Sequence, residues 1–168
     1  MGFLEFLATG AASEAAAADE YPNGAMRWSD PHTWGGSLPA TREAVTVDVG
    51  RTLIIDQDID VGSLHIKGTA IVERRDISIG AEWILVEGAG ALIAGSAEQP
   101  FKQRLHITLC SSASEPGATA HPQLGSKFLA ALNGGTIDLH GEARTSWVSL
   151  GNSTAPGHDT LRLAQPVD

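Results

Sequence analysis

Three aspartates alternate over a short stretch of this sequence, at Asp56, Asp58 and Asp60. Alternate side chains of an extended strand share a face, so the three carboxylates are predicted to lie together. Carboxylate oxygens are the ligands that calcium prefers, which makes calcium the one cofactor that the sequence leaves possible. The stretch lacks the glycine and the distal glutamate of an EF-hand loop. A solvated acidic turn that binds no metal is the alternative interpretation.

A second group combines aromatic and polar side chains. Trp28, Asp30, His32 and Trp34 alternate in one turn-rich segment. Aromatic faces stack on sugar rings and nearby polar groups bind their hydroxyls, so this group is a candidate carbohydrate-binding spot. The alternative is that both tryptophans pack in the core or cap its end.

Positive charge is concentrated at few places in the sequence. Arg74 and Arg75 form the densest one, and Lys102 with Arg104 forms a second. Guanidinium groups bind carboxylates through paired hydrogen bonds. Arg74 and Arg75 are therefore the predicted contact for an anionic polysaccharide, hyaluronan-like or alginate-like. Side chains that are merely solvated on a turn are the competing interpretation.

Signatures of catalysis are missing from the sequence. It contains no His-Glu-x-x-His arrangement, no Gly-x-Ser-x-Gly elbow and no phosphate-binding loop. The single cysteine, Cys110, excludes an internal disulfide and a cysteine-based zinc site. Because Cys110 ends an apolar run, 105–110, it is predicted to be a small thiol within a buried strand.

Net charge and hydropathy argue against nucleic acid as a partner and against a membrane-spanning segment. The formal net charge is −9, so the chain repels phosphate backbones and nucleic acid is not a predicted partner. No apolar run is long enough to span a bilayer, so the chain is not predicted to cross a membrane. Residues 1–26 are alanine-rich and acidic, which gives no recognisable amino-terminal signal peptide. A short helix or a disordered segment is expected there.

The rest of the chain, 27–168, contains short runs of β-formers separated by glycine and aspartate. Similar runs recur at intervals of about 20 residues, which is typical of stacked coils. The three series are 64–66, 83–86 and 105–109; 53–55, 71–72 and 92–93; and 59–61 with 77–79. The period predicts an all-β fold, a parallel β-helix or a β-helix-like roll. An antiparallel β-sandwich is the alternative.

Beyond Cys110 the period is interrupted. Residues 111–127 are predicted to form a long exposed loop. Residues 128–132 are a brief helix or strand, 136–141 and 145–150 return to β structure, and 161–163 form a last short strand. The end of such a stack exposes unpaired strand edges, so further coils or another chain are expected to cover it.

Several of these segments together resemble a known family. Residues 28–36 are similar to its opening motif, and its glycine-bounded strands resemble 50–56, 62–68 and 90–95. Residues 137–141 followed by 145–147 resemble what comes after the domain in larger members, and 161–168 resemble the next linker. The family is the eight-glycine, or G-eight, domain of large animal and bacterial surface proteins. The resemblance covers 27–168, and the signal-free start is consistent with a bacterial member.

The resemblance implies an extracellular β-rich module, often ahead of a right-handed parallel β-helix. Two animal relatives are linked to hyaluronan binding and breakdown, and calcium is implicated. No catalytic residue of the family can be placed on this sequence. The predicted function is a noncatalytic structural or carbohydrate-binding module, the amino-terminal part of a larger secreted or cell-surface protein. The alternatives are a fragment of a hyaluronidase-like or lyase-like polysaccharide-active enzyme, and an adhesin or filament assembly element.

Overall fold

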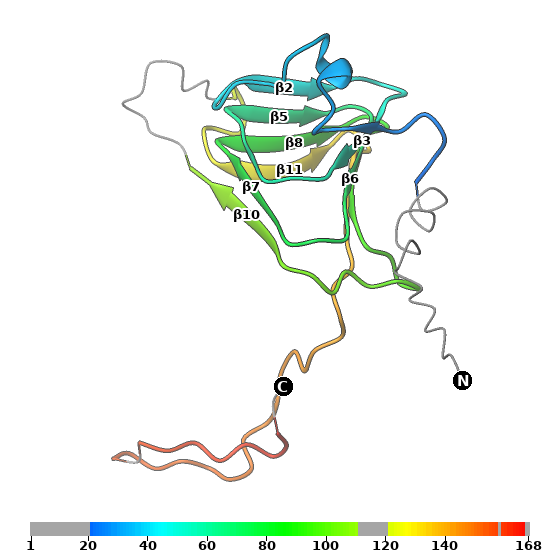
Figure 1. The fold of residues 1–168 in the computed structure, drawn as a ribbon. Helices are drawn as coiled ribbons and strands as arrows, with labels where there is room; N and C mark the ends of the chain where they lie inside the picture. Colours follow the sequence, from blue (N-terminus) through cyan, green and yellow to red (C-terminus); the bar gives the residue numbers. More distant parts are fainter. Residues whose placement is uncertain (1–20, 111–120, 158, 167–168) are drawn as a thin grey trace, which may run out of the picture.

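Short β-strands wind into stacked coils in the computed structural model, which describes residues 21–110, 121–157 and 159–166. Figure 1 shows the strands running side by side in successive layers. The elements are β1 (Met26–Arg27), the 3-10 turn η1 (Pro31–Trp34), β2 (Ala44–Val47), β3 (Thr52–Ile55), β4 (Ile59–Asp60), β5 (Ser63–Ile66), β6 (Thr69–Val72), β7 (Ile77–Ala81), β8 (Trp83–Glu87), β9 (Ala91–Ala94), β10 (Leu105–Leu109), β11 (Phe128–Leu132) and β12 (Thr136–Leu139). The predictions for residues 1–20 and 111–120 lie outside the described residues.

The described strands form three sheets in which all pairs are parallel. Sheet A has the order β1-β3-β6-β9-β12, sheet B the order β11-β8-β5-β2, and sheet C the order β10-β7-β4. The chain visits sheets B, A and C in turn, so the coils are β2-β3-β4, β5-β6-β7, β8-β9-β10 and β11-β12. This confirms the predicted β-helix-like roll and rules out the antiparallel sandwich.

Aliphatic ladders fill the interior of the roll. In sheet B, the strand register stacks Val45, Leu64, Ile84 and Leu129 on one another. The first three of these side chains are buried, whereas Leu129 in the last coil is only partly buried. Alternation along each strand sends every second side chain inward, and stacking brings like side chains together. The core therefore thins toward the carboxy-terminal end of the stack.

One of the three predicted strand series contains an error. β3, β6 and β9 stack in sheet A as predicted, and β4 stacks on β7 in sheet C. β10, however, pairs with β7 instead of β8, and β11 takes the place beside β8. The third coil contains longer connections than the first two, so spacing alone assigned β10 to the wrong sheet.

Glycines occupy one corner of the roll in successive coils. Gly68, Gly90 and Gly135 each come directly before a strand of sheet A. A Cβ atom at any of them would overlap a backbone carbonyl oxygen of the preceding coil, at Gly90 that of Ile66. The neighbouring amides also bond from coil to coil, for example Ala91 N to the carbonyl of Gly68 at 2.9 Å. The coils can approach this closely only where the side chain is a hydrogen atom.

The carboxy-terminal arm, residues 142–157 and 159–166, leaves the coils. Figure 1 shows the arm projecting beyond the end of the stack. Predicted strands at 145–150 and 161–163 are wrong: within the described part of the arm, the ladder is reduced to one antiparallel bridge between Leu150 and Leu163. An isolated two-stranded ribbon has no sheet or core to pack against, so it gains too little to form regular strands.

Candidate carbohydrate-binding surface

The predicted tryptophan pair closes the amino-terminal end of the roll, within a segment, residues 26–36, that we call the cap. Trp28 is only 3% exposed and belongs to the core. Trp34 meets it edge to face, with ring centroids 4.8 Å apart, and donates its indole N–H to the carbonyl of Trp28 at 2.9 Å. The Trp28 ring is therefore used for packing and is not exposed to stack on a sugar.

Asp30 and His32 lie at the surface of the same cap. Asp30 Oδ1 accepts hydrogen bonds from the backbone N–H of His32 at 2.9 Å and from its ring Nδ1 at 3.0 Å. The backbone bond first, and the ring bond second, lower the pKa of Asp30. Asp30 caps η1 in this way. With Arg27 and Thr33, the pair borders a shallow hollow of about 390 Å³.

The three alternating aspartates do not share a strand face. β3 ends at Ile55 and the chain turns before β4 begins, so Asp56 and Asp58 lie on a corner. Asp56 is 6% exposed, whereas Asp58 and Asp60 are exposed. Asp58 Oδ1 accepts the backbone N–H of Ser78 at 2.8 Å. Among the described residues, no group of three or more His, Cys, Asp and Glu side chains is arranged to hold a metal ion.

Asp56 belongs to a charged network that fastens the cap to the coils. Its carboxylate accepts from Ser29 N at 2.9 Å, from Ser29 Oγ at 2.6 Å and from Arg27 Nη1 at 3.3 Å. Arg27 Nη1 also donates to Glu73 Oε1 at 2.7 Å, and the bond to Glu73 is the main cause of the raised pKa of Arg27. Arg75 donates to the carbonyl of Asp56 at 3.1 Å. Arg75 is thus engaged in holding this corner.

Removing the Asp56 charge should weaken the fold. Asp56→Asn deletes the acceptor that Arg27 and the Ser29 hydroxyl share, in a buried position. We expect the free energy of unfolding to fall by about 1–3 kcal/mol, measured by urea unfolding. Asp58→Asn removes the same charge from an exposed position on this corner and keeps the Oδ1 that accepts from Ser78 N, so it should change the free energy of unfolding by less than about 0.5 kcal/mol. Equal losses in the two variants would contradict the role given to Asp56.

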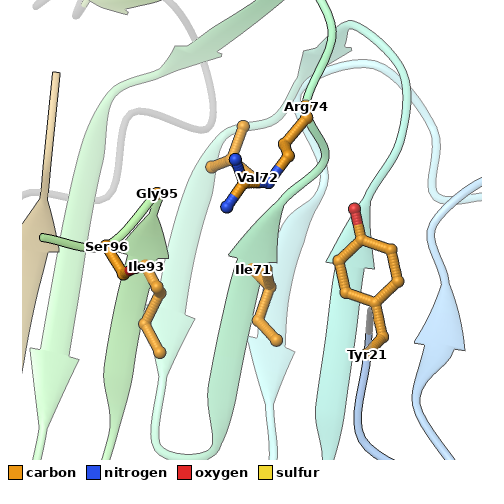
Figure 2. A pocket seen from close by; sticks show the side chains of 7 residues that line it. All are labelled: Tyr21, Ile71, Val72, Arg74, Ile93, Gly95 and Ser96. Atoms are coloured by element: carbon orange, nitrogen blue, oxygen red, sulfur yellow. The ribbon is translucent and has the colours of Figure 1, made fainter. Parts of the chain in front are cut away.

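Arg74 points to a different place, a pocket on the outer face of sheet A. Figure 2 shows Ile71 and Ile93 side by side on neighbouring strands, with Tyr21 to one side of them and Ser96 to the other. The pocket has a volume of about 170 Å³. Arg74 Nη2 donates to the carbonyl of Gln99 at 3.1 Å, which holds the guanidinium at the rim.

The composition of this pocket suits a sugar. Two isoleucines form an apolar floor, an aromatic ring stands at the edge, and a guanidinium and a hydroxyl supply polar contacts. Sugar sites combine an apolar or aromatic surface with a few oriented polar groups. Arg74 is the one predicted site residue in this pocket, since Trp28, Asp30, His32, Trp34 and Arg75 belong to the cap and its network. The pairing of β6 with β9 would have predicted that Ile71 lies beside Ile93, but no sequence pattern predicted that Tyr21 lines this pocket.

A second aromatic and polar group, not predicted, lies on the outer face of sheet B. Trp83 stacks on Phe128, with centroids 5.5 Å apart and planes 10° apart. Glu87 receives hydrogen bonds from Asn133 at 3.0 Å and from His65 at 2.9 Å, and these two bonds, that from Asn133 first, lower the pKa of Glu87. The members come from three coils, so the sequence shows no compact motif for them.

The prediction for Cys110 was wrong, because its thiol is exposed. β10 turns Leu105, Ile107 and Leu109 toward the interior. Because side chains alternate along a strand, Cys110 points away from the interior.

The sequence also predicted that the chain does not cross a membrane. In the described residues, no helix is long and apolar enough to span one.

Comparison with known proteins identifies relatives of this chain. The sequence profile of the G8 domain matches residues 33–151. Fibrocystin-L of Homo sapiens is 32% identical over 144 residues, which are 83% of this chain and 3% of that protein. The cell migration-inducing and hyaluronan-binding protein of Homo sapiens is 33% identical over 117 residues, 67% of this chain and 8% of that protein.

A third relative is the cell surface hyaluronidase of Danio rerio, 32% identical over 111 residues, which are 66% of this chain and 7% of that protein. The chain therefore spans less than a tenth of the length of each of these three proteins.

Proposed function

Because the chain belongs to the G8 domain family, we propose that it is a noncatalytic, extracellular module that binds an anionic polysaccharide. The relative named cell surface hyaluronidase supports an extracellular or cell-surface location. The relative named for hyaluronan binding supports a polysaccharide ligand. Each relative is matched over a small part of its length, so its whole activity is not transferred to this chain.

The pocket beside Arg74 carries this proposal. Its volume of about 170 Å³ suits one sugar unit of a chain that runs across the outer face of sheet A. A uronate in that position would rest its ring on Ile71 and Ile93 and direct its carboxylate to Arg74. The guanidinium supplies a charge-assisted hydrogen bond locally, although the net charge of −9 opposes anions at longer range.

Arg74→Ala should weaken binding of hyaluronan or alginate oligosaccharides by about ten-fold or more, because a hydrogen bond to a charged group contributes about 1.5–3 kcal/mol. Isothermal titration calorimetry with both oligosaccharides measures this. Arg162→Ala, which removes one positive charge from the arm, is the matched control and should bind like the unmodified chain. Equal affinities of all three proteins would reject Arg74 as the contact, and no binding by any of them would reject the carbohydrate function.

Calcium stays a prediction, centred on Asp56, Asp58 and Asp60. The same titrations with calcium and with a chelator test whether the ion contributes to binding. A noncatalytic module also leaves the polysaccharide length unchanged after prolonged incubation. Chain cleavage, measured by size-exclusion chromatography of the polysaccharide, would instead favour the enzyme-fragment alternative.

A further inference from the structure

The carboxy-terminal end of the coil stack exposes an apolar surface that we call the open end. Leu105 and Ile137, interior residues of the last coils, are only partly buried, and Leu139 is 44% exposed. A hollow of about 280 Å³ opens there, lined among others by Ala94 and Phe101. In the described chain β10, β11 and β12 are the edge strands of their sheets at this end. Edges of this kind pair readily with another chain.

The carboxy-terminal arm exposes a second apolar surface. Trp147 is 75% exposed and Leu161 is 62% exposed, and Leu150 and Leu163 are exposed as well. The bridge between Leu150 and Leu163 brings these two exposed leucines together on the arm. Figure 1 shows the arm pointing away from the coils, so these side chains do not cover the open end of their own molecule.

We infer that two copies of this chain associate at this end, with the arm of each lying across the open end of the other. One chain carries both surfaces, and a two-fold axis lets each surface meet its complement twice, the commonest symmetry among soluble oligomers. Contiguous apolar patches on a monomer mark such interfaces. This inference concerns a different surface from the Arg74 pocket and does not rest on the carbohydrate function.

The charge distribution also favours a second copy at this end. The whole chain is strongly acidic, which opposes self-association through most of its surface. Residues 101–168, however, carry no formal net charge, so the first 100 residues carry the whole excess of negative charge. The cations of this region are Lys102, Arg104, Lys127, Arg144 and Arg162, and its carboxylates are Glu115, Asp138, Glu142, Asp159 and Asp168. Two copies that meet here bring together their least acidic regions.

Multi-angle light scattering over a wide concentration range tests this association. The unmodified chain should shift from the mass of one copy to the mass of two as its concentration rises. Leu139→Lys, at the open end, and Leu163→Lys, on the arm, should each remain single at every concentration. Val49→Lys makes the same chemical change on an exposed turn near the opposite end of the stack and should still pair.

A mixture of Leu139→Lys and Leu163→Lys distinguishes exchange of arms from other modes of association. In the mixture, the intact arm of Leu139→Lys can lie across the intact open end of Leu163→Lys. One of the two arm contacts is thus restored, and partial pairing should return. A single-copy mass for the unmodified chain at all concentrations would overturn the inference. So would pairing that survives either substitution, or that is lost in Val49→Lys.

Discussion

Replacing Gly90 with alanine should lower the free energy of unfolding by about 3 kcal/mol, the upper end of the usual cost of overpacking. The added methyl group would overlap the backbone carbonyl oxygens of Ile66 and Glu87. Backbone atoms cannot turn aside as a side chain can, so the coils must separate at this corner. Separation also strains the hydrogen bonds from Ala91 N to the Gly68 carbonyl and from Thr136 N to the Gly90 carbonyl, which are 2.9 and 3.0 Å long.

Gly141→Ala is the matched control for this experiment. A Cβ atom at Gly141 would meet no atom within 4 Å, and its φ is not in the left-handed region. Stability should therefore change by less than about 0.5 kcal/mol. Urea unfolding followed by circular dichroism measures both variants. Similar stability of Gly90→Ala and Gly141→Ala would show that the coils are not in close contact at the glycine corner.

Leu64→Ala should cost about 2–5 kcal/mol of stability, the range for truncation of a fully buried leucine. Leu64 is completely buried in the second coil, between Val45 and Ile84 of the adjacent coils. Truncation leaves a cavity that rigid neighbouring strands cannot fill. The measurement is again urea unfolding, at a protein concentration low enough to keep the chain in single copies.

The same truncation at Leu129 gives the comparison. Leu129 occupies the equivalent inward position in the last coil, with Ile84 on one side and the open end on the other. Because the side chain is only partly buried, less apolar area is lost, and the cost should be about half that of Leu64→Ala. Equal costs would mean that the last coil is as well covered as the second.

The period of the sequence predicted most of the fold, because each coil repeats the same short strands. The stacking of β3, β6 and β9 can be inferred from spacings near 20 residues alone. The period failed at β10, since an insertion in the third coil changed the spacing without changing the order of the sheets. Prediction was also weak beyond Gly141, where the residues have strand-forming character but no neighbouring coil.

The candidate site was less predictable than the fold. Arg74 could be singled out as a concentration of charge, yet Arg75 beside it is held by the Asp56 carbonyl. Adjacent residues point in different directions, and sequence alone does not show which partner each one meets. Tyr21 reaches the pocket from outside the coil repeat, so no spacing rule could include it. The aspartates were misplaced because a corner at Asp56 interrupts the alternation that a strand would have continued.

The coils differ in length, and this difference predicts the order in which they fold. Leu64 pairs with Ile84, 20 positions later, whereas Ile84 pairs with Leu129, 45 positions later. Closing the longer loop costs about 0.7 kcal/mol more in chain entropy, because each doubling of loop length costs about 0.6 kcal/mol. The side chains of the fourth coil are also less buried than those of the inner coils, so less apolar burial offsets this loss of entropy. We therefore expect the fourth coil to form last and to fray first, with the middle coils as the folding nucleus.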